Sequence, residues 1–478
     1  MPESIKKRAT IGAIWAAVDR FGIVLLQFVI NIVLARLLTP EDFGCIGMIT
    51  IFVAVSQTLI DGGFGSALIQ KKDATQQDFS TIFFWNILFS GFLYVILFSA
   101  SPSIAAFFRM PQLTDILRVL GIVLLTNAFG LVQKVKLRKQ LDFRKIAISS
   151  IGSNAIAAVI AIVMAHNGFG VWSLVWMQLF TSVIFGIFLW ILAKWYPSLI
   201  FSLDSLKRLF GYGGYLLITN VLQDFCTHLQ GVVIGRKFSA VEMGLYSQAK
   251  KMDEVACLTF PNIIVQVVFP LYSELQNDLN RLRELLRQNT RVISFIIFPL
   301  MTLLIVIADQ IIVFLFGEKW VDAVPYFQVL CIGGFFACLQ NMNYYAIAAI
   351  GKSGTLFRWS FYKWGFLLTL LLVGTKFGMN GVLVAMVVSN INIYFINAYL
   401  VHRYIGYTIV RQLRDVAPML GCSILAGTLV TFTHIYTHLH FIPLTFLFTT
   451  IYMFVTWQCK LPAIKDVRSI VLTILNQK

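Results

Sequence analysis

Polar side chains recur at helical spacing inside segments that are otherwise apolar. The clearest stripe consists of Asn220, Asp224 and His228, which follow one another at steps of four and share one face of a helix. A polar stripe of this length cannot face lipid, where no water satisfies its hydrogen bonds. We expect it to line a substrate cavity, with hydrogen bonding between helices as the alternative.

Two further sets of polar residues lie near the amino terminus. Arg20, Gln27 and Asn31 share a helix face, with Asp19 beside Arg20. We expect this face to line a cavity as well; the alternative is that Asp19 and Arg20 neutralise each other. Asp61 follows one turn after Gln57 and opens the motif DGGFG. Its glycines permit close packing or a break in the helix, and the alternative is a functional hinge.

A pair of lysines lies in the sequence GLYSQAKKMDEVA at 244–256. Tyr246, Lys250 and Asp253 share a face there, and Lys251 follows Lys250. Ammonium groups attract phosphate, so these lysines and Tyr246 are candidates for binding an anionic headgroup. In the alternative interpretation Lys250 pairs with Glu254 one turn later, which lets both charges be buried.

Carboxylates inside membrane segments are costly to bury and usually have a function. We therefore treat five of them as candidates for coupling transport to a proton or sodium ion: Asp61, Asp224, Asp19, Asp253 and Glu254. A phosphate-binding GxxxxGK[ST] motif is absent, and the seven cysteines and six histidines show no ligand spacing. The sequence thus predicts no catalytic residue, cofactor or metal, and no enzyme.

The elements that must position these residues are membrane helices. The chain has 478 residues, of which 58% are hydrophobic and 13% charged. Apolar runs of about 20 residues, each long enough to cross the hydrocarbon core, recur between residues 12 and 458. They predict an all-α polytopic membrane protein of about fourteen transmembrane helices, the first of them an uncleaved span.

The net charge of +16 would suggest nucleic acid as the partner of a soluble protein, but in a membrane protein the location of the charges matters more. With the amino terminus in the cytoplasm, most of the 38 lysine and arginine residues fall on the cytoplasmic side of the fourteen spans. The positive-inside rule then places both termini in the cytoplasm. We expect no nucleic-acid partner.

The chain also contains an internal repeat. ARLLTPEDFG at 35–44 matches GRKFSAVEMG at 235–244, and shorter matches follow in the same order further along. The repeat predicts two six-helix lobes of equal orientation, residues 1–200 and 201–405, with the site between them near the bilayer midplane. Residues 406–478 have no counterpart and are expected to form two additional transmembrane helices and a cytoplasmic tail.

Four segments resemble the polysaccharide transporter branch of the multidrug/oligosaccharidyl-lipid/polysaccharide flippase superfamily. They are VLARLLTPEDFG at 33–44, DGGFGSALIQKKD at 61–73, GLYSQAKKM at 244–252 and FGEKW at 316–320. The resemblance covers essentially the whole chain and is strongest to Wzx-type O-antigen flippases and to colanic acid or teichuronic acid exporters.

The resemblance implies two six-helix bundles around a cationic central cavity that opens alternately to either side of the bacterial cytoplasmic (inner) membrane. The implied substrate is an undecaprenyl-diphosphate-linked oligosaccharide, with its diphosphate on Lys250 or Lys251. A polysaccharide polymerase and chain-length proteins are the implied partners, besides membrane lipids and a proton or sodium counter-ion. The alternative within the superfamily is a multidrug/cation antiporter, whose cavity would be dominated by carboxylates.

Overall fold

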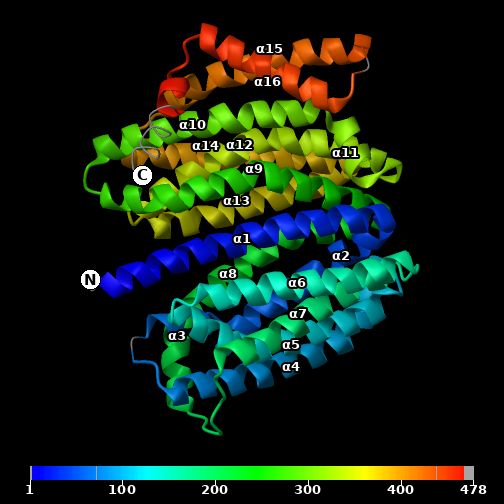
Figure 1. The fold of residues 1–478 in the computed structure, drawn as a ribbon, viewed down its shortest axis with the longest axis vertical. Helices are drawn as coiled ribbons and strands as arrows, with labels where there is room; N and C mark the ends of the chain where they lie inside the picture. The colour runs from blue at the N-terminus through cyan, green and yellow to red at the C-terminus, as the bar shows by residue number, and fades with distance from the viewer. Residues whose placement is uncertain (1–2, 72, 438, 468–478) are drawn as a thin grey trace. The chain divides into compact units, whose positions relative to one another are not determined.

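The described part of the protein is helical throughout. The computed structural model describes residues 3–71, 73–437 and 439–467, and within them no β-strand occurs. The chain divides into two compact units, Met1–Gly244 and Leu245–Lys478, which are coloured blue to green and green to red in Figure 1. The predicted all-α membrane architecture is confirmed.

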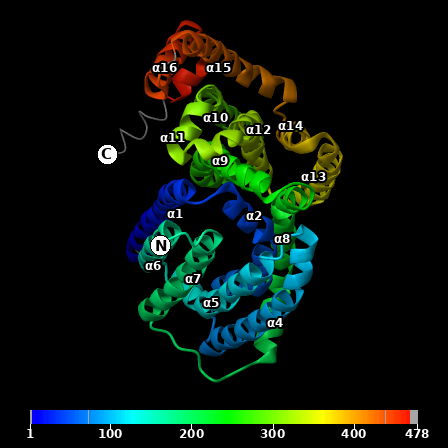
Figure 2. The same ribbon diagram turned by 90° about the vertical axis from the view of Figure 1, so that its right-hand side faces the viewer.

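The N-terminal unit holds eight helices. They are α1 (Glu3–Leu37), α2 (Pro40–Asp61), α3 (Phe64–Gln70), α4 (Gln76–Phe108), α5 (Leu113–Lys139), α6 (Phe143–His166), α7 (Val171–Ala193) and α8 (Leu203–Lys237). Seen end on in Figure 2, α1, α6, α7, α5 and α4 follow one another in an arc, and α8 packs along α2 and α4.

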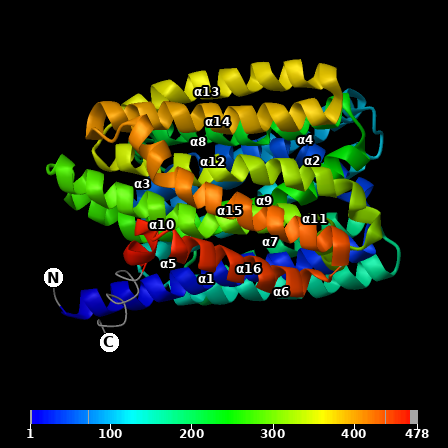
Figure 3. The same cartoon turned by 90° about the horizontal axis from the view of Figure 1, so that it is seen from above.

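The C-terminal unit begins within α9 (Ala240–Glu274). It continues with α10 (Leu279–Val306), α11 (Ala308–Phe316), η1 (Glu318–Ala323), α12 (Val324–Ala349), α13 (Ser353–Gly374), η2 (Thr375–Phe377), α14 (Gly378–Ile405), α15 (Ile409–Thr437) and α16 (Phe441–Gln458). Figure 3 shows α13 beside α14, and α15, which packs on α10, beside α16. The two additional helices expected after residue 406 are therefore present as α15 and α16.

Eleven described segments are long and apolar enough to cross a membrane. One of them, 353–405, contains two helices, α13 and α14. The helices α8 and α9 are not among the eleven. The count of fourteen spans and the lobe boundaries after residues 200 and 405 stay predictions.

The DGGFG motif breaks the second predicted span. Helix α2 ends at Asp61, and both Gly62 and Gly63 adopt left-handed backbone conformations, with φ of 56° and 70°. A residue with a Cβ pays roughly 1–2 kcal/mol in this region, which is why glycines stand here. The chain then re-enters a helix as α3, so the glycines form a break in the helix, while a functional hinge stays a prediction.

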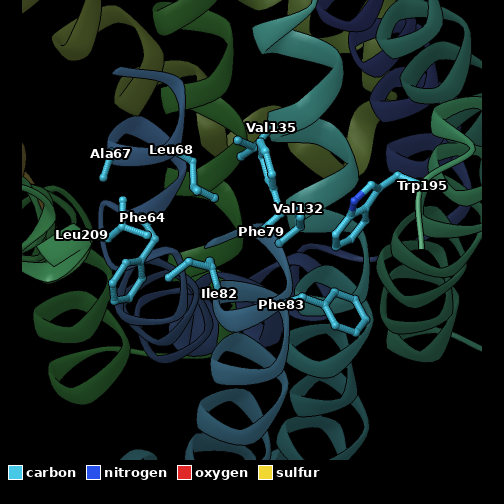
Figure 4. Close-up of a cluster of buried hydrophobic side chains, with 10 residues drawn as sticks. All are labelled: Phe64, Ala67, Leu68, Phe79, Ile82, Phe83, Val132, Val135, Trp195 and Leu209. Carbon is cyan, nitrogen blue, oxygen red and sulfur yellow. The ribbon is translucent and has the colours of Figure 1, made fainter. Parts of the chain in front are cut away.

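Helix α3 is short and is held in place by its surroundings. Its Phe64, Ala67 and Leu68 are buried in an apolar cluster with side chains of α4, α5 and α8, drawn in Figure 4. At its C-terminal end the ammonium of Lys139, from α5, donates to the carbonyl oxygen of Leu68 at 3.0 Å. A cation at this position satisfies a carbonyl that the helix leaves unpaired. The segment that follows the glycine break is thereby fixed relative to α5.

The two copies of the repeat begin their helices in the same way. Thr39 caps α2 by accepting from the backbone N–H of Asp42, and Ser239 likewise accepts from the N–H of Glu242, at 3.1 Å. The glycines that end the two copies approach the opposite copy. A Cβ on Gly44 would overlap the carbonyl oxygen of Ala240, and a Cβ on Gly244 would overlap that of Pro40. The first residues of α2 and α9 therefore cross with main chain against main chain.

Candidate functional site

A cavity of about 370 Å³ lies within the N-terminal unit, among α2, α3, α5 and α8. Three of the residues singled out from the sequence, Asp61, Asn220 and Asp224, line it together. The remaining lining residues are Gln57, Thr58, Gly65, Ser66, Ile69, Leu131, Lys134, Val135, Arg138 and Gln223. The structure thus brings the polar stripe of α8 and the carboxylate at the end of α2 to one site.

Asp61 reaches the cavity because of the helix break that follows it. Its carboxylate lies where α3 begins, so close to Gly65 that a Cβ on that glycine would be 3.1 Å from Oδ1. Across the cavity, Lys134 and Arg138 of α5 act on Asp61 by Coulomb attraction. Within the described chain, however, none of these three side chains forms an ion pair at 4.0 Å or less. Both signs of charge therefore face an open space.

Asp224 is fixed by a side chain from the neighbouring helix. The hydroxyl of Thr58, on α2, donates a short hydrogen bond to Oδ2 of Asp224, on α8. One turn away on α2, the Gln57 side chain accepts from Nδ2 of Asn127, on α5, at 2.9 Å. These two contacts set the orientation of the α2 side chains between α5 and α8, and they leave the second oxygen of Asp224 for other partners.

Lys134 and Arg138 are cavity residues that the sequence analysis does not single out. The fourth apolar run fades near residue 133, but the helix continues to Lys139. Lys134 and Arg138 are one turn apart and share a face with Leu131 and Val135, which could have indicated a cationic helix end directed at a cavity. The cations of this site therefore come from α5.

The polar residues of α1 lie along α6, outside this cavity. Asp19 accepts a short hydrogen bond from the Ser150 hydroxyl, and Nε2 of Gln27 donates to Oδ1 of Asn154 at 3.4 Å. Asp19 also attracts Lys134 electrostatically. Among the described residues no ion pair joins Asp19 to Arg20, whose side chain is exposed, so the two do not neutralise each other directly.

Asn31, farther along α1, is half-buried. His228 is half-buried on α8, one turn beyond Asp224. Neither of them lines the cavity. The prediction that Arg20, Gln27, Asn31 and His228 bind substrate remains untested.

The lysine pair belongs to α9 of the C-terminal unit. Lys250 forms an ion pair with Glu254 at 3.8 Å, as in the alternative interpretation, and its ammonium lies 5.7 Å from the ring centre of the buried Tyr246. Asp253 accepts from the thiol of Cys257, 3.7 Å away on the next turn. Lys251 is exposed. The internal pairing of Lys250 is confirmed, while phosphate binding by either lysine remains a prediction.

The cavity in the N-terminal unit suits a ligand that is both anionic and rich in hydroxyl groups. Ammonium and guanidinium groups bind phosphate oxygens, and Arg138 can do so with two parallel hydrogen bonds. Carboxylate and amide groups on the opposite wall, from Asp61, Asn220 and Gln223, can accept and donate hydrogen bonds to sugar hydroxyls. The lining residues can thus bind such a ligand through hydrogen bonds and electrostatic attraction.

Solved structures with the same fold are membrane transporters. The chain is similar to the lipid II flippase MurJ in an inward closed conformation, with a TM-score of 0.78 and 15% identity over 93% of this chain and 98% of that one. It is also similar to an inward-facing multidrug resistance MATE transporter of the MOP superfamily, with a TM-score of 0.64 and 14% identity over 83% and 98% of the two chains. These two solved structures share the fold of this chain.

Proteins related in sequence assign the chain to one family. The chain is 30% identical to the teichuronic acid biosynthesis protein TuaB of Bacillus subtilis (strain 168) over 74% of each chain. It is 24% identical to the lipopolysaccharide biosynthesis protein WzxC of Escherichia coli (strain K12), over 82% of this chain and 81% of that one. Residues 33–325 match the family described as polysaccharide biosynthesis protein. The chain belongs to this family, which confirms the resemblance found in the motifs.

Proposed function

We propose that this protein is a flippase that moves undecaprenyl-diphosphate-linked oligosaccharides across the bacterial cytoplasmic membrane. Its family membership supports this, as do relatives named for the biosynthesis of teichuronic acid and lipopolysaccharide and for the transport of succinoglycan. The surplus of lysine and arginine on one side of the spans supports cytoplasmic termini. Transport, and no covalent chemistry, is the proposed activity.

The observation that carries the proposal is the charged cavity within an otherwise apolar bundle. A saccharide head that crosses the bilayer unaided must bring many hydroxyl groups and a diphosphate into hydrocarbon, at several kcal/mol for each unpaired group. The wall formed by Lys134 and Arg138 offers cations that form no close ion pair with another described residue, and the facing amides and carboxylates offer hydrogen bonds. Such a surface replaces the lost hydration of the head.

In this proposal the diphosphate-linked oligosaccharide head crosses the membrane by alternating access between two lobes, residues 1–200 and 201–405. The undecaprenyl tail stays in lipid. Lys250 and Lys251 of α9 supply a second set of cations to the diphosphate in this scheme. Arg20, Gln27, Asn31, His228 and Tyr246 are the further substrate contacts that we propose. A polysaccharide polymerase and chain-length proteins would receive the exported unit.

Energy for directed transport comes from a proton or sodium gradient in this proposal. Asp61 and Asp224 are the best placed of the candidate carboxylates, because both line the cavity in which the headgroup cations lie. Asp19, Asp253 and Glu254 are the remaining candidates. A counter-ion bound at Asp61 would weaken its attraction to Lys134 and Arg138, which would leave those cations more available to the diphosphate.

The test is a flipping assay in proteoliposomes with a fluorescent undecaprenyl-diphosphate-linked N-acetylglucosamine as the probe. A membrane-impermeant reductant quenches only the outward-facing probe, so flipping appears as additional loss of fluorescence. We expect Lys134→Ala to slow flipping roughly tenfold to a hundredfold, because a charge-assisted contact is worth about 1.5–3 kcal/mol. Lys207→Ala, at an exposed position of α8 outside the cavity, is the matched control and should flip like the unchanged protein.

Equal rates for Lys134→Ala and Lys207→Ala would remove this cavity from the mechanism. Equal rates for proteoliposomes and protein-free liposomes would contradict the flippase function itself. Ethidium efflux by the same proteoliposomes, in the absence of flipping, would favour the multidrug/cation antiporter of the same superfamily.

A further inference from the structure

A second charged cavity, of about 440 Å³, lies in the C-terminal unit where α10 and α15 begin. Five arginines and two carboxylates line it, which leaves a clear excess of positive charge. The proposed transport mechanism uses none of these residues. We call this cavity the arginine pocket.

Two of the five arginines are engaged in holding helices together. Arg287, on α10, donates to both oxygens of Asp415, on α15, at 2.7 and 2.9 Å. The Tyr407 hydroxyl donates to the same carboxylate at 2.8 Å. Burial raises the pKa of Tyr407, and the Asp415 carboxylate raises it further, so the hydroxyl keeps its proton. Arg291 pairs with Asp466 at 2.9 Å. These contacts fix the walls of the pocket.

The other three arginines, Arg283, Arg411 and Arg414, form no ion pair within the described part of the chain. Arg283 is held from behind: its Nε donates to the carbonyl oxygen of Ile405 at 2.9 Å. Its guanidinium lies so close to Gly406 that a Cβ there would be 2.6 Å from Nη2. Arg411 and Arg414 lie near the start of α15 with exposed side chains. One oriented and two adjustable guanidinium groups thus meet in one cavity.

This arrangement matches a phosphate group. Guanidinium groups bind phosphate oxygens in pairs, and the positive ends of the α10 and α15 dipoles add to the attraction because both helices begin at the pocket. The remaining wall is apolar, formed by Pro418, Met419, Leu461 and Pro462. A basic pocket with an apolar side at the end of membrane helices has the chemistry that receives a lipid headgroup and the first part of its chains.

We propose that the arginine pocket binds the phosphate of an anionic phospholipid headgroup from the cytoplasmic leaflet, through Arg283, Arg411 and Arg414. The leaflet follows from the proposed topology, in which the connections before α10 and α15 are cytoplasmic. The ligand is a resident lipid and not the transported substrate. The bound phosphate draws α10 and the start of α15 together alongside the ion pair between Arg287 and Asp415.

The test measures lipid retention by native mass spectrometry of the purified protein, offered equal amounts of phosphatidylglycerol and phosphatidylcholine. We expect the unchanged protein to retain phosphatidylglycerol in preference. The double variant Arg411→Gln/Arg414→Gln should lose about tenfold or more of that affinity. The control Arg358→Gln/Arg403→Gln removes two exposed arginines of the same unit that lie outside the pocket, and it should retain the lipid like the unchanged protein.

A third variant, Arg411→Lys/Arg414→Lys, keeps the charge but loses the paired hydrogen bonds, and an intermediate affinity is expected. Equal retention by the glutamine double variant and the control would overturn the proposal. Binding of inorganic phosphate to the pocket without any preference between the two lipids would overturn the lipid source and assign the pocket to a soluble anion. None of these readouts depends on flipping, so a failed flippase assay leaves them interpretable.

Discussion

The two charged cavities differ in whether their charged side chains form close ion pairs. In the N-terminal unit Asp61 faces Lys134 and Arg138 across an open space, and within the described chain these side chains form no close ion pair. In the C-terminal unit Arg287 and Asp415 meet with two hydrogen bonds of 2.7 and 2.9 Å, and the Asp415 side chain is only 9% exposed.

This difference in ion pairing indicates a different role for each set of charged side chains. A charge pair with ideal geometry holds two helices at a fixed distance, and breaking it leaves a desolvated ion behind. Charges kept apart in a solvated cavity contribute little to stability and remain available to a ligand. We therefore expect the pair between Arg287 and Asp415 to act on stability and the cavity of the N-terminal unit to act on transport.

The largest effect on stability is expected from Asp415→Asn. The substitution leaves the Arg287 guanidinium without its carboxylate and removes a strong acceptor from Tyr407, so unfolding should become easier by about 2–3 kcal/mol. Thermal or denaturant unfolding in detergent measures this change. The control is Glu284→Gln: its carboxylate lies 3.9 Å from Arg287 but is 67% exposed, and the expected change is below about 0.5 kcal/mol.

If both variants unfold alike, the pair between Arg287 and Asp415 is not a structural clamp and the contrast with the N-terminal unit disappears.

A smaller effect, about 1–2 kcal/mol, is expected from Gly62→Ala. The added methyl group must occupy a backbone with φ of 56° and would lie 2.6 Å from the Phe64 ring. Flipping should slow as well, because the break sets the direction of the Asp61 carboxylate. Gly91→Ala is the control: it lies within α4 with no atom close to an added Cβ, so alanine should stabilise this helix slightly. Unchanged flipping in Gly62→Ala would show that the cavity tolerates a shift of α3.

The smallest effect is expected from Thr58→Val, which keeps the shape of the side chain and removes the hydroxyl that donates to Asp224. The loss of one hydrogen bond to a partly solvated carboxylate should cost about 0.5–1.5 kcal/mol of stability. Thr50→Val, whose hydroxyl donates to the carbonyl of Ile46 in its own helix, should change stability less. A larger loss in Thr50→Val would mean that Asp224 does not depend on its neighbour in α2.

Much of the cavity of the N-terminal unit could be predicted from local periodicity. Asn220 and Asp224 occupy the same face of α8 because a helix repeats every 3.6 residues, and a break in the helix was one of the interpretations open for the glycines after Asp61. The repeat aligns Thr39 with Ser239, and the structure shows that each of them caps a helix. These features depend on residues a few positions apart, where the sequence alone fixes the geometry.

The contacts that could not be predicted join distant residues. Ser150 forms its hydrogen bond with Asp19 because α1 packs on α6. Arg287 forms its ion pair with Asp415 because α15 packs on α10. Lys134 was not singled out, for a different reason: hydropathy marks where an apolar run ends, while a helix end directed at a cavity can carry charge and still lie inside the bundle. Packing, which periodicity does not encode, decides such cases.

The crossing of α2 and α9 limits which substitutions this protein can accept during evolution. The space at Gly44 and Gly244 is filled by the carbonyl oxygens of Ala240 and Pro40, which every amino acid would place there. No exchange of the facing residue could therefore make room for a methyl group at either glycine. A genetic screen for second-site suppressors of Gly44→Ala should recover true revertants, and both copies of the repeat are held to the same residue at this point.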